Sequence, residues 1–160
     1  MKMKLTLVLF GLMMAVAANA QFEKGKKYIG ASLSGLNMSY NGSEKGHFGV
    51  DAKAGYLFTE DWMATGQVSY DKQKDIPAAL SIGAGARYYI VQNGLFLGAS
   101  VNYLHCGSAY DDLMPSVQIG YAFFLSHTVT IEPEIYYNHS FKSHSDYSTI
   151  GFRVGFGIYL

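Results

Sequence analysis

Apolar residues alternate with small or polar residues in eight separate stretches of this 160-residue chain. From Phe48 to Phe58, for example, every second residue is apolar. A side-chain period of two is typical of a β-strand with two unlike faces, because a helix repeats its faces about every 3.6 residues. The eight apolar rows lie within 28–40, 48–58, 62–70, 80–90, 95–103, 117–123, 129–137 and 150–160. The alternation therefore predicts an all-β fold of eight antiparallel strands.

Two positions disturb the alternation. The first row changes parity near Gly35, where one extra residue in the strand is the simplest explanation. Pro133 lies in the middle of its row and has no N–H to donate to a neighbouring strand. We therefore expect a β-bulge at each of these two positions.

The connections between the rows are of two kinds. Tight turns are expected at 59–61, 93–94 and 125–127. Counted outward from these turns, the strands would pair Phe58 with Trp62, Tyr88 with Ala99 and Phe123 with Val129. The other connections are longer and polar, at 41–46, 72–77, 107–113 and 139–147. Short turns on one side and long loops on the other are typical of an outer-membrane barrel.

The composition of the two strand faces separates a soluble lipocalin-like barrel from a membrane-spanning one. Only 15% of the residues are charged, against about 25% in ordinary soluble domains. No Lys, Arg, Asp or Glu occurs in the apolar rows, which suits lipid, where a charge near the midplane costs about 2–4 kcal/mol. Aromatic residues gather at both ends of the rows, as interfacial girdles do. These features favour an eight-stranded antiparallel up-and-down transmembrane β-barrel over the lipocalin alternative.

The first segment of the chain has the form of a secretory signal peptide. Residues 1–20 begin with two lysines, continue with an apolar run and end in the small-x-small motif Ala18-Asn19-Ala20. Without those two lysines, the mature barrel domain, 21–160, has ten cations against 12 carboxylates, a net charge of −2. We therefore expect an exported protein without a membrane helix. We expect no nucleic-acid partner, because such binding needs a basic surface.

The charged residues of the strands fall on the face opposite to the apolar rows. This inward face carries Asp51, Lys53, Gln67, Arg87, Gln118, Glu132, Glu134 and Arg153. An unpaired charge in a narrow lumen is costly, so we predict a salt-bridge and hydrogen-bond cluster centred on Glu132, with Arg87 or Arg153 as its partner. Structural filling of the lumen is one interpretation of this cluster, and a gate or proton path is the other.

One loop raises the question of catalysis. The segment 138–147 contains His139, Ser140, His144, Ser145 and Asp146, the residue types of an esterase-like site. Adjacent strand residues point to opposite faces, so this spacing alone does not form a triad, and a solvated polar loop is the ordinary interpretation. We predict no metal site and no cofactor, since the histidines have no evident third ligand and no cofactor motif occurs. The redox role of the one cysteine, Cys106, is left open.

Three motifs carry a resemblance to a known family. They are Gly55-Tyr56-Leu57-Phe58, Ala86-Arg87-Tyr88-Tyr89 and the closing strand from Phe152 to Leu160. Together they resemble the outer-membrane β-barrel domain family common in Bacteroidota, which is similar in architecture to the small outer-membrane proteins A and X. The resemblance covers 21–160 and implies a place in the bacterial outer membrane. It also implies that the barrel-assembly machinery recognises the last strand, although Leu160 stands where Phe is more usual.

A filled lumen and polar loops lead us to expect a structural or surface-interaction role rather than an enzymatic one. The expected partners are outer-membrane lipid, the assembly machinery during biogenesis and a surface ligand at the loops, with the protein as a monomer. Two alternatives are open: a narrow or gated channel through the lumen, and a lipid-modifying enzyme that uses residues 138–147.

Overall fold

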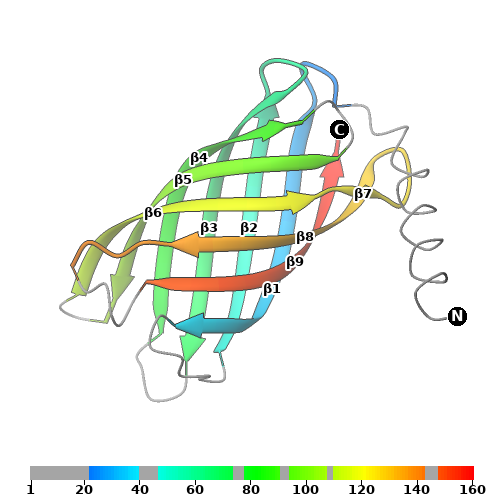
Figure 1. Cartoon of the computed structure of the whole chain (residues 1–160). Coiled ribbons are helices and arrows are strands. Elements are labelled where there is room, and N and C mark those ends of the chain that lie inside the picture. The colour runs from blue at the N-terminus through cyan, green and yellow to red at the C-terminus, as the bar shows by residue number, and fades with distance from the viewer. Residues whose placement is uncertain (1–21, 40–46, 74–77, 91–93, 108–109, 143–147) are drawn as a thin grey trace, which may run out of the picture.

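The computed structural model describes residues 22–39, 47–73, 78–90, 94–107, 110–142 and 148–160. The predicted signal peptide, 1–20, lies outside these residues. The strand segments are β1 (Lys27–Ser39), β2 (His47–Leu57), β3 (Trp62–Gln73), β4 (Ala79–Tyr89), β5 (Leu95–Cys106), β6 (Tyr110–Tyr121), β7 (Phe123–Phe124), β8 (Val129–Asn138) and β9 (Thr149–Tyr159). Figure 1 shows them as one wall of tilted strands in which most consecutive strands lie side by side. In the described part of the chain, no helix is long and apolar enough to cross a membrane.

The sheet closes on itself through antiparallel pairs. β1 pairs with both β2 and β9, and β8 pairs with both β9 and β6. β6 and β7 continue one strand across Ala122, because Gly120 faces Glu134 and Phe123 faces Ile131 in the same register. The predicted fold class, an all-β barrel of eight antiparallel strands, is therefore confirmed.

The two expected irregularities differ in kind. The pairing of β1 with β9 shifts between Ser34 and Leu36, so the predicted bulge at Gly35 is confirmed. The bulge expected at Pro133 is wrong, because β8 keeps one register against β9 along its whole length. Instead, the β6–β8 pairing stops at Glu134 and the β7–β8 pairing resumes at Ile131. A proline without an N–H interrupts the ladder here and inserts no extra residue.

One of the three tight turns has the expected register and two do not. The turn at 59–61 pairs Tyr56 with Ala64, as predicted. Tyr88, however, pairs with Leu97 instead of Ala99. A shift of two residues keeps every side chain on its face, so the alternation cannot detect it. The same error occurs at the third turn, where Phe123 pairs with Ile131 instead of Val129.

The loop expected at 107–113 is shorter than predicted. β6 already begins at Tyr110, and Leu113 pairs with Tyr103 of β5. Leu113 is exposed and continues the outward apolar row. Two aspartates precede it in the sequence, so this part of the strand has the composition of a polar loop. β3 likewise runs to Gln73, into the loop expected at 72–77. The strands therefore extend further toward the loop end than the apolar rows indicate.

The two faces of the barrel are those that the alternation predicts, with the ordinary polarity of a soluble protein reversed. Ile82 on the outer face is 61% exposed, whereas Glu132 on the inner face is 2% exposed. Large apolar residues cover the outside of every long strand, and polar residues and glycines face the lumen together with an apolar cluster at the turn end. This arrangement places the apolar surface against the surroundings and the charges in the interior.

Candidate functional site

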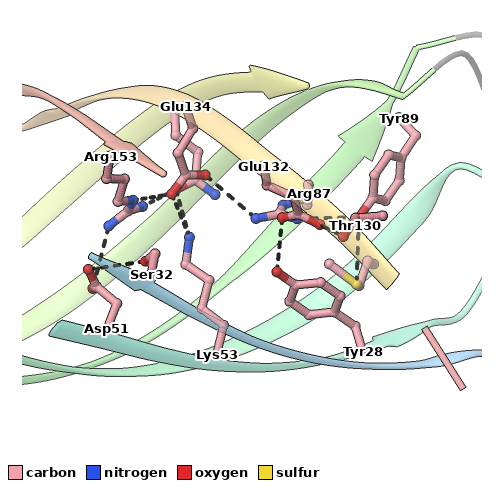
Figure 2. A network of polar contacts seen from close by, with 12 residues as sticks. Tyr28, Ser32, Asp51, Lys53, Arg87, Tyr89, Thr130, Glu132, Glu134 and Arg153 are labelled. Carbon is pink, nitrogen blue, oxygen red and sulfur yellow. Dashed lines mark hydrogen bonds and ion pairs between the residues drawn. The ribbon is translucent and has the colours of Figure 1, made fainter. Parts of the chain in front are cut away.

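Of the eight inward residues expected from the sequence, seven are buried inside the barrel, each at most 8% exposed, and Gln118 is partly buried. Six of them meet in one connected set, which we call the lumen network: Asp51, Lys53, Arg87, Glu132, Glu134 and Arg153. Gln67 lies apart, because its side-chain amide donates a hydrogen bond to Asn102. Figure 2 shows that the network divides into a half around Glu132 and a half around Glu134.

The half around Glu132 combines one cation with three hydroxyl groups. Arg87 Nη1 lies 2.8 Å from Glu132 Oε2, which also accepts a hydrogen bond of 2.9 Å from the hydroxyl of Tyr28. Glu132 Oε1 accepts hydrogen bonds from the hydroxyls of Thr130, at 2.8 Å, and Tyr159, at 3.1 Å. Both carboxylate oxygens therefore have partners despite their burial, as a buried charge requires.

The half around Glu134 is built from cations. Glu134 Oε1 lies 3.0 Å from Lys53 Nζ and accepts a hydrogen bond from Arg153 Nε. Arg153 also reaches Asp51, with 3.4 Å between Nη1 and Oδ1, and donates from Nη2 to Gln118 Oε1 at 2.7 Å. These residues come from strands that do not all pair with one another, so their contacts cross the lumen as well as running along the wall.

Arg87 connects the two halves. Its Nη2 lies 3.6 Å from Glu134 Oε2, while its Nη1 faces Glu132. Its guanidinium stacks on the ring of Phe96, with Cζ 3.9 Å from the ring centroid. Of the two partners expected for Glu132, Arg87 is thus the one that binds it, and Arg153 binds Glu134 instead. The network holds three cations and three carboxylates, so it is electrically balanced.

A mainly aromatic cluster closes the turn end of the lumen, between Glu132 and the tight turns. The cluster consists of Phe22, Tyr28, Leu57, Met63, Tyr89, Phe96, Ala122 and Tyr159. Phe22 is fully buried and stacks on Tyr89, with ring centroids 3.8 Å apart. The segment before β1 is fixed over the mouth because Gly25 N donates to Leu57 O at 2.8 Å. Gly25 has a φ of +94°, a conformation that favours glycine.

Sequence reasoning missed the hydroxyl and aromatic members of this site. Tyr28, Tyr89 and Tyr159 occupy inward positions of their strands, each adjacent to an outward apolar residue. Strand parity could have identified them, because each is the chain neighbour of an outward residue in an apolar row. Phe22 precedes the first strand, so no periodicity applies to it and the sequence contains no signal for its insertion.

Buried polar contacts lie at the loop end of the barrel. The hydroxyl of Ser140 donates to Asp112, and the backbone N–H of Ser140 donates to the hydroxyl of Ser148 at 3.0 Å. Both serines are buried. His139 instead faces Tyr137, with 3.1 Å between Nδ1 and the phenol oxygen, and packs edge-on against Phe141.

These contacts bear on the esterase-like alternative. Among the described residues of 138–147, Ser140 and His139 contact different partners and do not form a nucleophile–base pair. His144, Ser145 and Asp146 lie outside the described residues. The described part of the chain also contains no group of three or more His, Cys, Asp or Glu side chains that could hold a metal ion.

A second polar contact lies on the outer surface at the loop end. His105 Nδ1 is 2.6 Å from Asp111 Oδ1, and Lys142 Nζ donates to the backbone oxygen of Asp111 at 2.6 Å. Cys106 follows His105 on β5 and is buried.

Comparison with solved structures agrees with this architecture. The barrel is similar to the N-terminal β-barrel domain of OprF from Pseudomonas aeruginosa, with a TM-score of 0.65, 11% identity, and coverage of 86% of this chain and 98% of that one. It is also similar to Neisserial surface protein A (TM-score 0.57, 18% identity, 83% and 95% covered). A third similar structure is Ail, the attachment invasion locus protein of Yersinia pestis (0.52, 16%, 86% and 99%). No protein-family model and no curated protein matches the chain. At these identities the likeness establishes the fold, that of the small eight-stranded outer-membrane barrels.

Proposed function

We propose that this protein is a non-catalytic barrel of the bacterial outer membrane with a structural or surface-interaction role. The observation that carries the proposal is the reversed polarity of the wall: an apolar outer surface surrounds a filled, charge-balanced lumen. An apolar outer belt requires lipid, and a barrel of eight strands leaves an interior that side chains fill. The Bacteroidota-type family, the signal peptide at 1–20 and the assembly machinery as a partner belong to the same proposal.

The filled lumen argues against the channel alternative. Contacts of Arg87 with Glu132, and of Lys53 with Glu134, connect different strands across the interior. The aromatic cluster around Phe22 closes one end, and the contact between Ser140 and Asp112 restricts the other. The loops and the barrel wall then remain as the parts that carry the function. Loops suit the binding of a surface ligand, and a barrel in the membrane suits a role in envelope integrity.

The location is tested by fractionating cells that express the full chain, followed by electrophoresis with and without boiling. We expect the protein in the outer-membrane fraction, lacking residues 1–20, with a folded band that moves differently from the boiled one. A soluble periplasmic protein without heat modifiability would overturn the proposal in favour of the lipocalin alternative.

The role is tested in a deletion strain compared with its parent for envelope permeability, surface adhesion and lipid A profile. We expect a change in permeability or adhesion and an unchanged lipid A profile. A lipid A change that His139→Ala reproduces would support the enzyme instead. Steady conductance of the purified protein in planar bilayers, abolished by Glu132→Gln, would support the channel.

A further inference from the structure

A small cavity lies between the two halves of the lumen network. Its volume is about 10 Å³, and its walls include Tyr28, Lys53, Arg87, Glu134 and Gly155. This volume is the space open to the centre of a water molecule, and about 10–15 Å³ of such space holds one water when polar groups surround it. The site is therefore large enough for a single water and too small for an organic ligand.

Two of the residues that line this cavity each carry a buried polar atom without a hydrogen-bond partner among the described residues: Arg87 Nε and Glu134 Oε2. One is a donor and the other an acceptor. Nη2 of the same guanidinium is 3.6 Å from Glu134 Oε2, beyond an ordinary hydrogen bond. Phe96 covers one face of the guanidinium, so a partner for Nε must approach in the guanidinium plane. One molecule that accepts from Nε and donates to Oε2 would satisfy both atoms.

The charges of the network select a neutral molecule. Lys53, Arg87 and Arg153 are balanced by Asp51, Glu132 and Glu134. A chloride or a cation would add an uncompensated charge to a buried site, and such a charge is costly in a low-dielectric interior. Water is neutral, and it both donates and accepts hydrogen bonds.

We propose that one ordered water molecule binds between Arg87 and Glu134 and joins the two halves of the lumen network. It accepts a hydrogen bond from Arg87 Nε and donates one to Glu134 Oε2. This water site is independent of the proposed function, because the same water would fit in the lumen of a structural barrel or of a gated channel.

NMR of the protein in detergent micelles, with arginine side chains labelled with nitrogen-15, tests the site directly. The wild-type Arg87 Nε–H should show a cross-peak to a bound water, and a high-resolution crystal structure should show one density peak between the two atoms. Absence of both would overturn the proposal. An anomalous peak at this position in crystals grown in bromide would also overturn it, because the occupant would be an anion.

Gly155→Ala provides the matched variant. Gly155 lines the cavity, and an added Cβ would lie 3.3 Å from the Ser32 Cβ, which requires only a small adjustment. We expect its methyl group to displace the water, remove the cross-peak and lower the melting temperature. Gly66→Ala is the control, because a Cβ there meets nothing within 4 Å and should leave the cross-peak unchanged. A cross-peak that persists in Gly155→Ala would contradict the assigned position, and if that variant does not fold, the wild-type measurements still decide.

Discussion

Glu132 and Glu134 lie two residues apart on β8, face the same lumen and are equally buried, yet their surroundings differ. Glu132 contacts one cation and three hydroxyl groups, whereas Glu134 contacts three cations. A hydroxyl can reverse its role from donor to acceptor, but an ammonium or guanidinium only donates. The comparison shows that one barrel can bury two identical carboxylates in different surroundings. The hydroxyl groups around Glu132 can adapt to a change of the side chain, whereas the cations around Glu134 require its negative charge.

The largest expected effect is that of Glu134→Gln. Among the described residues, this change removes the carboxylate that Lys53 contacts, leaves Arg153 with Asp51, and removes a charge that faces three cations. We expect a loss of about 3–5 kcal/mol in the free energy of unfolding, the usual cost of breaking a buried ion pair. Urea unfolding in detergent micelles measures it, and a loss under about 1 kcal/mol would contradict the charge-dependent account.

Glu132→Gln should cost less, about 1–3 kcal/mol. The amide oxygen can still accept from Arg87 and Tyr28, and the amide nitrogen can donate to the hydroxyls of Thr130 and Tyr159. The same unfolding measurement compares the two variants. If Glu132→Gln proves as destabilising as Glu134→Gln, the hydroxyl groups do not compensate and the comparison fails.

Phe22→Leu tests the aromatic cluster beneath Glu132. Leucine keeps most of the apolar volume but loses the stack on Tyr89 and the edge contact with Tyr159. We expect a loss of about 0.5–1.5 kcal/mol, the worth of such aromatic pairs. Phe141→Leu is the matched control, because Phe141 is 70% exposed and should be close to neutral. Equal effects at the two positions would show that Phe22 does not close the lumen in the membrane protein.

Salt should have the smallest effect. Both halves of the network are buried, so raising sodium chloride from about 0.1 to about 1 M should change the difference in unfolding free energy between wild type and Glu134→Gln by less than about 0.5 kcal/mol. Unfolding curves at the two salt concentrations give this difference. A strong dependence on salt would mean that solvent ions reach the network.

Much of the architecture could be predicted because it depends on local alternation. The strand faces, the bulge at Gly35 and the turn at 59–61 all follow from side-chain parity and turn length. The registers of the other two turns could not be predicted in this way, because a slip of two residues preserves both faces. Pro133 was misjudged for a different reason: its missing N–H was recognised, but a break in the ladder and a bulge are equally compatible with it.

The residues that form the candidate site could be predicted from the sequence, but the pairs that they form could not. Strand parity assigns Lys53, Arg87, Glu132 and Arg153 to the interior, and the cost of buried charge requires that they pair. Which cation meets which carboxylate depends on the register and stagger of the strands, which residue types alone do not specify. Arg153 lies opposite Glu134 in the register of the consecutive strands β8 and β9, whereas Arg87 of β4 reaches Glu132 of β8 across the lumen.

The sequence by itself determined that this chain is a barrel with an apolar outside and a charged interior, because a period of two and the composition of each face are local properties. Only the tertiary structure decided that the interior separates into two unlike carboxylate sites above an aromatic cluster that contains Phe22. Those contacts arise when the closed wall brings distant strands within reach of one another across the lumen, and no local pattern records that distance.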